Sequence, residues 1–541
     1  MEHNSFYNLH GDVLESLKKR IDNFKEGYRQ NIALLGDEFS GKTTLLKQLA
    51  SQMHDEKLAC IYVDIPPFEF QLFLKRSLNS LLYGHLKNRQ LISARENLSN
   101  LVQIAKETLP QTSLLIETLL SRIDKDKAEN LFRDLFGIIE SFTAETKKNC
   151  VIIFDEFQHI KEFGQKNIWN ELGKKLMFEK SSLFIFASSC KNEAKDIFSN
   201  ELALLFGNFE TMELPAIKNE EASSLILHYL YNIPVEKDLI SFMINFTGNN
   251  PFYLKTICEA ARLENAVANN TGLNKQTLAD ILENLLFNEW GVFNLKFTIS
   301  LSQITSSRNK NEYTYILSSI ARGKNRLKDL ASFLRRPKQE LNQKLKKLQD
   351  SGLISKSGSF YSLCDRMMSF WLKFVLNEKL CALSPDYMEQ ALHFKKMIQS
   401  EIEEFIQVSK TGFADRMIDL FNHFEGDDVQ FEKKRFQLSA FKELKIIHFE
   451  NPNLKVGIFA KAQDSLWLAA VKEEGLNEHD VNEFIQNAKR YKHKAINKLI
   501  LCLGDIDRNA RLLAKESHIL TWDLASINNL MDIYGKPRIV K

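Results

Sequence analysis

A glycine loop between an apolar run and a segment with helical spacing constrains this fold more than any other feature. Residues 36–43 read Gly-Asp-Glu-Phe-Ser-Gly-Lys-Thr, which fits the pattern G-x-x-x-x-G-K-[ST]. The apolar residues 32–35 precede the loop, and residues 44–49 continue with helical spacing. Strand, loop and helix follow one another as in a phosphate-binding loop, which predicts an α/β P-loop domain, a parallel sheet with helices on both faces.

The residue types of this loop suit a phosphate chain. Gly36 and Gly41 permit torsions and a close approach that a Cβ would block, so backbone N–H groups can face phosphates. Lys42 is placed to reach the β and γ phosphates, and the Thr43 hydroxyl to bind Mg²⁺. We therefore expect ATP and Mg²⁺ as ligands; a vestigial loop is the alternative. The expected contacts are Gly36, Asp37, Glu38, Phe39, Ser40, Gly41, Lys42, Thr43 and Thr44.

Hydrolysis also needs carboxylates, for the metal and for the attacking water. Residues 151–154 form a continuous apolar run, typical of a buried parallel strand, and Asp155 and Glu156 follow it. We expect Asp155 to hold Mg²⁺ through water and Glu156 to orient or deprotonate the attacking water, with Lys42 as the third catalytic group. The alternative is a pair of surface acids that merely follows a core strand.

Residues 58–64 and 183–187 fit the same sheet. P-loop ATPases place a polar group that senses the γ-phosphate after a strand like the second, which makes Ser189 a sensor candidate; ordinary turn chemistry is the alternative. The Leu-rich residues 66–149 have helical periodicity and predict an insertion that caps the nucleotide domain.

A second region stands out by its charge. The whole chain carries only +3, whereas residues 306–373 hold fifteen Lys and Arg against five acids, a net charge of +10. Helical patterns at 313–321, 327–334 and from Pro337 to 350, followed by a hairpin at 353–363, predict a winged helix. In DNA-binding versions the third helix enters the major groove. The DNA candidates are Lys338, Lys344, Lys346, Lys347 and, in the hairpin, Lys356.

The alternative for this region is a winged helix that only packs against the ATPase core, with lysines that solvate a surface. The concentration of cations favours contact with double-stranded DNA, because neutralising phosphates requires them.

From about residue 394 onward, the order of apolar and helical segments predicts an α/β domain. Its elements are a long helix (394–424), strands (444–450, 455–461, 466–472), a helix (478–491), a strand (498–504), a helix (509–516), a strand (519–522) and a helix (523–534).

The order of motifs resembles the archaeal-type ATPases, the MNS group within the STAND class of AAA-related signalling ATPases. The resemblance extends over about residues 5–375. It rests on residues 36–43, 151–156, Leu205-Phe206-Gly207-Asn208, 212–215, 247–254, 361–365 and 370–375. It implies that Pro251 touches the nucleotide, at the end of a turn in which Asn249 replaces a glycine and tolerates positive φ. The resemblance also implies an arginine at the position where this chain has Asn208. The absence of that arginine favours slow hydrolysis.

The last region resembles the restriction-endonuclease-like domain that often follows such ATPases. Active members need an acid on the second strand and Glu-x-Lys on the third, to hold metal and to place a lysine beside the attacking water. The third strand here ends Ala470-Val471-Lys472, and residues 455–460 contain no acid. We expect a degenerate, inactive fold kept for binding or assembly, with Lys472 as a remnant. The alternative is that Asp415, Asp464, Glu473 or Glu474 substitutes for the missing acids.

The expected domains are a P-loop ATPase (1–215), a helical lid (216–300), a winged helix (301–376) and the nuclease-like domain (377–541). The predicted function is a slowly hydrolysing switch that couples nucleotide state to DNA or a protein partner; a second copy of the chain as partner stays open. An ATP-regulated nuclease and a non-hydrolysing scaffold are the alternatives, while the last domain argues against an origin-recognition-type initiator. Without a long apolar stretch or a secretory signal, we expect a cytoplasmic protein that binds no membrane.

Overall fold

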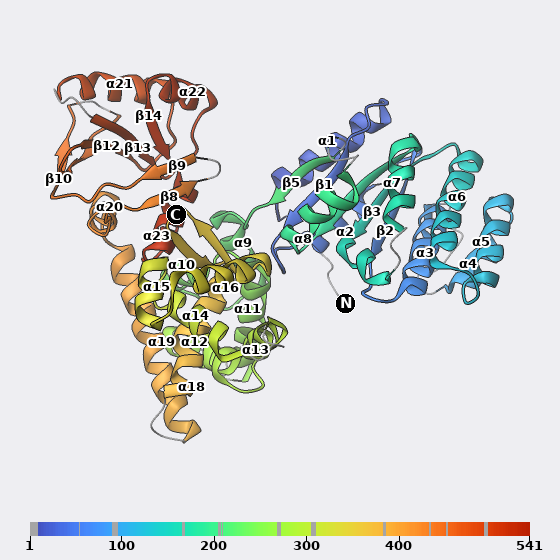
Figure 1. The fold of residues 1–541 in the computed structure, drawn as a ribbon, viewed down its shortest axis with the longest axis horizontal. Coiled ribbons are helices and arrows are strands. Elements are labelled where there is room, and N and C mark those ends of the chain that lie inside the picture. The colour runs from blue at the N-terminus through green and yellow to red at the C-terminus, as the bar shows by residue number, and fades with distance from the viewer. Residues whose placement is uncertain are drawn as a thin grey trace. The chain divides into compact units, whose positions relative to one another are not determined.

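The computed structural model divides into two compact units, Met1–Ile217 with Asn250–Phe252, and Lys218–Asn249 with Tyr253–Lys541. We call them the nucleotide unit and the C-terminal unit, and each is described by itself (Figure 1). The described residues are 9–53, 55–88, 96–164, 168–203, 207, 209–267, 272–304, 310–381, 386–431, 434–450, 453–491 and 496–541. Leu205, Phe206 and Asn208 of the resemblance lie outside them.

A five-stranded sheet forms the centre of the nucleotide unit. Its strands are β1 (Asn31–Gly36), β2 (Leu58–Asp64), β3 (Asn149–Asp155), β4 (Ser182–Ser188) and β5 (Phe209–Leu214). All neighbours pair in parallel, in the order β2-β3-β4-β1-β5, which confirms the predicted parallel sheet. The sequence did not predict β5, because this edge strand has only one buried residue, Leu214, and lacks an apolar run. The loops that follow β1, β3 and β4 meet at one edge.

Helices cover both faces of this sheet because successive strand residues point to opposite sides. Val151 and Ile153 of β3 share a core with α1 (Gly11–Lys25) and α2 (Lys42–Gln52). Ile152 and Phe154 pack on the other side with the helices that precede and follow β3. These are α3 (Phe70–Asn88), α4 (Leu98–Ala105), α5 (Pro110–Arg122), α6 (Ala128–Thr146) and α7 (Ile168–Phe178).

The segment 66–149 is therefore more than a cap over the nucleotide domain. The apolar side chains of α3 to α6 join the core on one face of the sheet, because the parallel crossover from β2 to β3 needs helices there. The described residues of this unit also form the short elements η1 (Phe157–Phe163), α8 (Lys191–Asp196) and η2 (Ile197–Glu201).

The C-terminal unit begins with helices. They are α9 (Asn219–Tyr229), α10 (Lys237–Thr247), α11 (Pro251–Val267, whose first two residues belong to the nucleotide unit), α12 (Lys275–Leu282), η4 (Glu283–Phe287) and α13 (Val292–Ile304). The predicted three helices and hairpin follow as α14 (Lys310–Ala321), α15 (Leu327–Leu334), α16 (Lys338–Asp350), β6 (Ile354–Ser357) and β7 (Phe360–Leu363). Pro337 is the N-cap of α16. Then come α17 (Arg366–Phe370), η5 (Trp371–Leu376) and α18 (Asn377–Cys381).

The expected long helix at 394–424 is wrong. The chain forms α19 (Tyr387–Ser409) and α20 (Phe413–Phe421), because Gly412, the N-cap of α20, is extended at ψ 150° and interrupts the helix. A two-stranded hairpin that was not predicted follows, β8 (Asp428–Phe431) with β9 (Lys434–Gln437).

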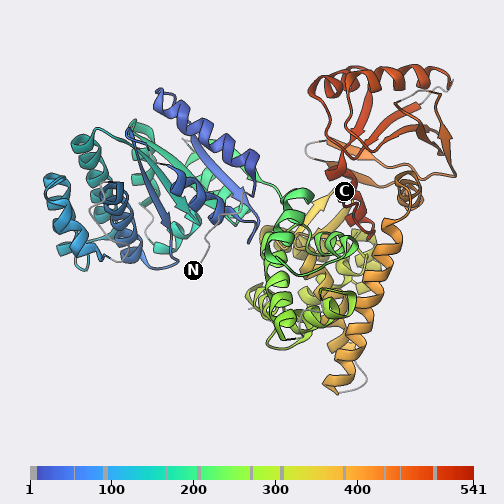
Figure 2. The same ribbon diagram turned by 180° about the vertical axis from the view of Figure 1, so that it is seen from behind.

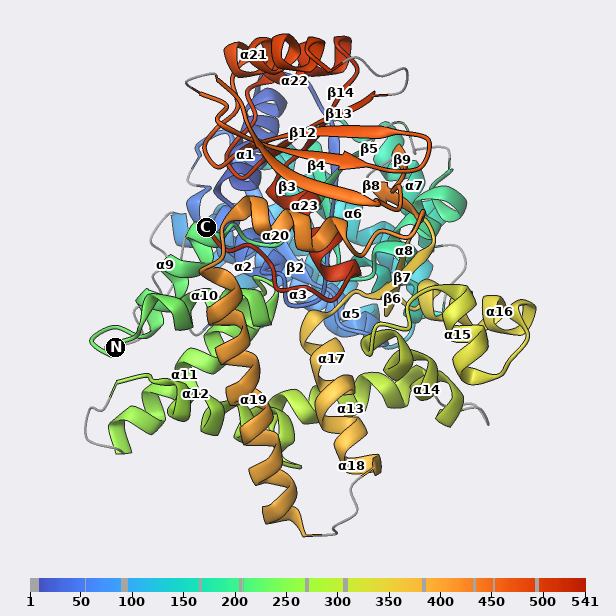
Figure 3. The same cartoon turned by 90° about the vertical axis from the view of Figure 1, so that its left-hand side faces the viewer.

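A mixed sheet closes the unit, in the order β10-β11-β12-β13-β14. Its strands are β10 (Glu443–His448), β11 (Val456–Lys461), β12 (Leu466–Lys472), β13 (Ile496–Cys502) and β14 (Ile519–Trp522). The first three pair antiparallel and the last three parallel. Helices α21 (Glu478–Lys489) and α22 (Arg508–Glu516) pack on one face, α20 and α23 (Leu524–Ile533) on the other (Figures 1 and 3). The strands and helices that the sequence predicted from residue 444 onward are confirmed.

The turn of the β6–β7 hairpin docks on β8. The Ser359 backbone N–H donates to the Asp428 carbonyl at 2.9 Å, and the Ser357 hydroxyl donates to the Gln430 carbonyl at 2.9 Å. A Cβ on Gly358, which has a φ of +60°, would lie 2.1 Å from the Asp428 oxygen, so only glycine fits this contact. The hairpin turn is thus part of an internal interface.

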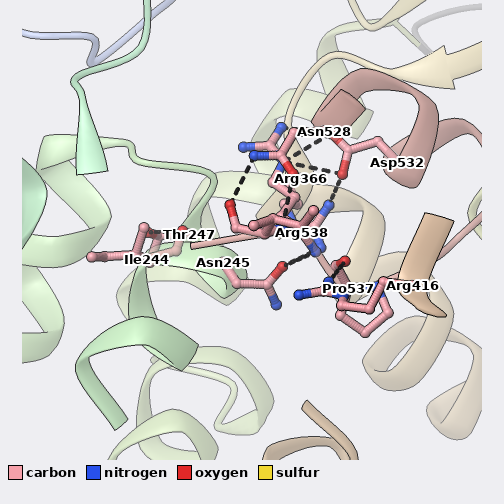
Figure 4. A network of polar contacts seen from close by, with 10 residues as sticks. Ile244, Asn245, Thr247, Arg366, Arg416, Asn528, Asp532, Pro537 and Arg538 are labelled. Carbon is pink, nitrogen blue, oxygen red and sulfur yellow. Dashed lines mark hydrogen bonds and ion pairs between the residues drawn. The ribbon is translucent and has the colours of Figure 1, made fainter. Parts of the chain in front are cut away.

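A partly buried ionic network joins α10, α17 and the chain end (Figure 4). Arg366 and Arg538 both pair with Asp532 of α23. Asn245 of α10 accepts from Arg366 Nη2 and from the Arg538 backbone N–H, each at 2.9 Å. Burial alone would raise the pKa of Asp532, but the charges of both arginines outweigh it and lower that pKa. Helical, hairpin and C-terminal regions are therefore held in one body, whose reverse side Figure 2 shows. Among the described residues, no helix is both long and apolar enough to cross a membrane.

Candidate functional site

The glycine loop joins β1 to α2 as expected, and its two glycines are needed for different reasons. Gly41 has a φ of +97° and is the N-cap of α2. Gly36 lies so close to β5 that an added Cβ would meet the Leu214 Cβ at 3.0 Å. Within the loop Ser40 is buried, whereas Asp37, Glu38 and Phe39 are exposed, as is Thr44 in the following helix.

Lys42 is folded back over its own loop. It is 4% exposed, and its ammonium group donates to the carbonyl oxygens of Gly36 at 3.1 Å and Asp37 at 2.8 Å. Burial lowers the pKa of Lys42, and the nearby carboxylates of Glu156 and Asp155 oppose that shift. The positive charge is thus held at the loop by dipoles of the backbone.

The predicted metal pair comes together at the end of β3. Asp155 is fully buried, and its Oδ2 accepts from the Thr43 hydroxyl at 2.7 Å and from the Tyr62 hydroxyl at 3.0 Å. Burial raises the pKa of Asp155; the Thr43 hydrogen bond lowers it and the Glu156 charge raises it further. Tyr62 was not predicted, because only the parallel register of β2 and β3 brings it to this carboxylate.

Glu156 is held in a strained position next to Asp155. Its φ of +52° lies in the left-handed region, which is uncommon for residues other than glycine and often marks functional sites. Its Oε2 accepts from Gln158 Nε2 at 2.7 Å, and from the Ser189 backbone N–H at 3.0 Å and hydroxyl at 2.7 Å. The structure therefore places the Ser189 side chain, expected as a phosphate sensor, on the carboxylate of Glu156.

Pro251 lies beside the glycine loop. A Cβ on Gly41 would be 3.7 Å from Pro251 Cγ, and the ring of Phe252 stacks on that of Phe39 with centroids 4.5 Å apart. Gly248 and Asn249 precede this segment with φ of +65° and +62°. The expected turn with Asn249 at positive φ is therefore present.

The residues of this site fit a magnesium nucleotide. The Ser40 hydroxyl oxygen is buried and has no hydrogen-bond partner in the part of the chain that the structure describes, as expected for a group that meets a ligand. Thr43 and Asp155 offer the oxygen atoms that Mg²⁺ prefers. No three His, Cys, Asp or Glu among the described residues cluster as metal ligands. A magnesium ion at Asp155 would thus take further oxygens from phosphates and water.

The comparisons agree with this geometry in the nucleotide unit. Residues 25–197 match the family described as AAA domain. This segment is therefore similar to an AAA domain. No curated protein is found to match the chain.

The solved structures that match the chain are distant in sequence. A Walker-type ATPase of Pyrococcus abyssi is 16% identical with a TM-score of 0.47, over 67% of this chain and 94% of that one. The ORC2 protein of Aeropyrum pernix, solved with ADPNP and ADP, is 13% identical with a TM-score of 0.44, over 72% and 94%. The RuvB Holliday junction branch migration motor of Thermotoga maritima is 13% identical with a TM-score of 0.33, over 67% and 95%.

The structure separates the lysines expected to meet DNA. Lys338, Lys346 and Lys347 are exposed on α16, and Lys356 is exposed on β6. Lys344 is different: its side chain is 13% exposed and pairs with Glu340 at 2.6 Å and with Glu312 of α14. It lies on the side of α16 that packs against α14, and its role as a DNA contact stays a prediction.

Part of the positive charge of residues 306–373 is neutralised by acidic residues from other parts of the chain. Arg326 pairs with Asp427 at 2.6 Å, and Arg366 pairs with Asp532. The unpaired positive charge of residues 306–373 is therefore smaller than the +10 counted from the sequence.

Lys472, the expected nuclease remnant, ends β12 in a buried ion pair. Its ammonium group lies 2.8 Å from Asp480 Oδ1, with side-chain exposures of 10% and 0%. Asp480 also accepts from the Asn477 backbone N–H at 3.0 Å and so caps α21. The suggested substitutes Asp464, Glu473 and Glu474 are exposed.

Proposed function

We propose that the chain is an ATPase of the AAA type that hydrolyses ATP slowly and uses nucleotide state to control binding of DNA or a protein partner. One observation carries this proposal: Thr43, Asp155 and Glu156 meet beside the glycine loop, with the hydroxyl of Thr43 on the carboxylate of Asp155. The AAA-domain match over residues 25–197 supports it.

Each residue has a defined task in this proposal. Lys42 exchanges its carbonyl partners for phosphate oxygens, which form stronger charge-assisted bonds. Thr43 and Asp155 hold Mg²⁺, which neutralises charge on the phosphates. Glu156 orients the attacking water and accepts its proton at the carboxylate. Pro251, beside Gly41, contacts the nucleotide.

Slow hydrolysis follows from the surroundings of Glu156. Gln158 and Ser189 together donate three hydrogen bonds to Oε2, which leaves Oε1 for the water but ties the group to one orientation. A carboxylate held in one orientation by three donors turns less readily toward an attacking water. The missing arginine at position 208 acts in the same direction.

Single-turnover phosphate release tests hydrolysis. Glu156→Gln should retain MgATP binding and lower the release rate by about a hundredfold or more, since it removes the proton acceptor. Glu107→Gln, at an exposed position of the same unit, is the matched control. Unchanged release in Glu156→Gln would contradict the ATPase proposal and favour the non-hydrolysing scaffold.

For DNA we propose the exposed face of α16, which carries Lys338, Lys346 and Lys347. The hairpin turn is held by β8, so the helix is the better candidate for phosphate contacts. Mobility shifts of duplex DNA across salt concentrations should show a steep salt dependence. Replacing the three lysines by alanine should lower the slope of log K against log salt by roughly 3, about 0.9 per phosphate contact.

The control for this experiment replaces three exposed lysines outside α16, namely Lys396, Lys410 and Lys515. An equal loss in the control would indicate binding by general charge alone. Absence of any shift at low salt would remove DNA and leave a protein partner as the output.

An ATP-regulated nuclease is the second candidate, and the Lys472–Asp480 ion pair speaks against it. We propose that the C-terminal sheet serves binding or assembly. Incubation of the protein with plasmid and Mg²⁺ or Mn²⁺ should give no nicking. Nicking that the substitution Lys472→Ala abolishes would support the nuclease hypothesis.

A further inference from the structure

Lys191 brings a second ammonium group to the glycine loop. It is the first residue of α8 and follows Ser189 by two positions, after β4. Its Nζ lies 3.0 Å from Oδ1 of Asp37. The three-dimensional fold thus links the end of β4 to the loop after β1, because the two strands are parallel neighbours.

The charges around the loop call for such a cation. Asp37, Glu38, Asp155 and Glu156 all lie in or next to this site, and a triphosphate adds further negative charge. Lys42 donates to the Asp37 carbonyl oxygen at 2.8 Å, and Lys191 Nζ lies 3.0 Å from Oδ1 of the same residue. The two ammonium groups are therefore close enough to act on one phosphate chain.

The present partner of Lys191 is easily exchanged. The side chain of Asp37 is 70% exposed and that of Lys191 is 29% exposed, and ion pairs this open to solvent contribute little. A phosphate oxygen offers a stronger charge-assisted bond. Lys191 therefore loses little when it leaves Asp37 for a phosphate.

We propose that Lys191 binds the terminal phosphate of the nucleoside triphosphate and so makes the site distinguish ATP from ADP. This rests on the proposed nucleotide binding. The Lys191 ammonium group adds a second positive charge to that of Lys42 at the glycine loop. The segment that carries Lys191 also carries Ser189, which holds Glu156, so a shift of Lys191 toward phosphate acts on the water-orienting carboxylate through two residues.

Equilibrium binding of ADP and of a non-hydrolysable ATP analogue, both with Mg²⁺, tests this proposal. Lys191→Ala should weaken the ATP analogue about tenfold or more and leave ADP unchanged, because one charge-assisted bond to the terminal phosphate is lost. Lys191→Arg should keep most of the preference. Lys195→Ala, on the same helix and near Glu213 at 3.7 Å, is the control and should change neither affinity.

Asp37→Asn separates phosphate binding from support of the loop. It should tighten the ATP analogue, because it removes the carboxylate that competes for Lys191 while keeping the backbone carbonyl that holds Lys42. If Asp37→Asn weakens the analogue as Lys191→Ala does, or if Lys191→Ala weakens both nucleotides equally or neither, the inference is wrong. If the unaltered chain binds neither nucleotide, the proposed function itself fails.

Discussion

Each of the two five-stranded sheets has a buried lysine and a buried aspartate at or just after the end of a strand, yet the surroundings of the two pairs differ. In the nucleotide unit Lys42 donates to backbone carbonyls, and Asp155 accepts from the hydroxyls of Thr43 and Tyr62. In the C-terminal unit Lys472 and Asp480 bind each other at 2.8 Å. Neutral dipoles hold the first two charges in place without cancelling them, so they remain available to a ligand. The second pair is already neutralised.

The largest expected effect concerns the C-terminal pair. Lys472→Ala leaves Asp480 buried without its counter-charge and should lower the free energy of unfolding of the C-terminal unit by about 3–5 kcal/mol. Denaturant unfolding followed by the fluorescence of the buried Trp467 and Trp522 measures it. ATP hydrolysis should not change. Lys472→Met combined with Asp480→Asn, which keeps the helix cap, should recover most of the loss; a stable single variant would show that the pair is not structural.

The matching change in the nucleotide unit should affect binding and spare the fold. Lys42→Ala should weaken MgATP binding by at least about a hundredfold, since a buried charge–phosphate contact is removed. The folded-state pKa of Lys42 is lowered, so at neutral pH its charge opposes folding, and that penalty fades only as pH rises toward 10.5. Thermal unfolding of the variant at neutral pH should therefore occur at an equal or higher temperature. A lower one would make Lys42 structural, as Lys472 is.

Addition of MgATP should stabilise one unit and not the other. At a hundred times its dissociation constant, MgATP should stabilise the nucleotide unit by about 2.7 kcal/mol and leave the C-terminal sheet unaffected. Hydrogen exchange of α2 and β3, compared with β12 and α21, measures both in one experiment. Chelation of Mg²⁺ should reduce the protection. Equal protection of both sheets would show that they respond as one.

The smallest effect concerns Tyr62. Tyr62→Phe removes one hydrogen bond from Asp155 and should weaken MgATP binding by about 1 kcal/mol at neutral pH. The pKa of Asp155 is raised by burial, and loss of a donor to its carboxylate raises it further. Because Mg²⁺ needs the ionised carboxylate, affinity falls as pH drops through this pKa, and the fall should begin at higher pH in the variant. Tyr83→Phe is the control; an unshifted pH profile would contradict the role.

Much of the nucleotide unit was predictable, because its signals are local. A glycine loop after an apolar run and an acid pair after another specify strand ends, and parallel strands bring those ends to one edge. Strands 58–64 and 183–187 were also predictable, because each is a continuous apolar run. The edge strand β5 was not predicted, because its residues are mostly partly buried or exposed and form no apolar run.

The partners of charged residues were not predictable. Tyr62 and Asp155 are 93 residues apart, and Arg326 and Asp427 are 101 apart. Counting charge along the chain assigned +10 to residues 306–373, because the acids that neutralise Arg326 and Arg366 come from other elements.

The sequence by itself determined where this protein places a phosphate loop, two carboxylates and alternating strands and helices, because backbone torsion and apolar periodicity are properties of neighbours in the chain. Only the tertiary structure decided which charges stay free. Lys344 and Lys472 are bound by Glu312 and Asp480, whereas Lys42 meets carbonyl oxygens. Electrostatic partnership depends on distance in space, and a one-dimensional pattern does not contain that distance.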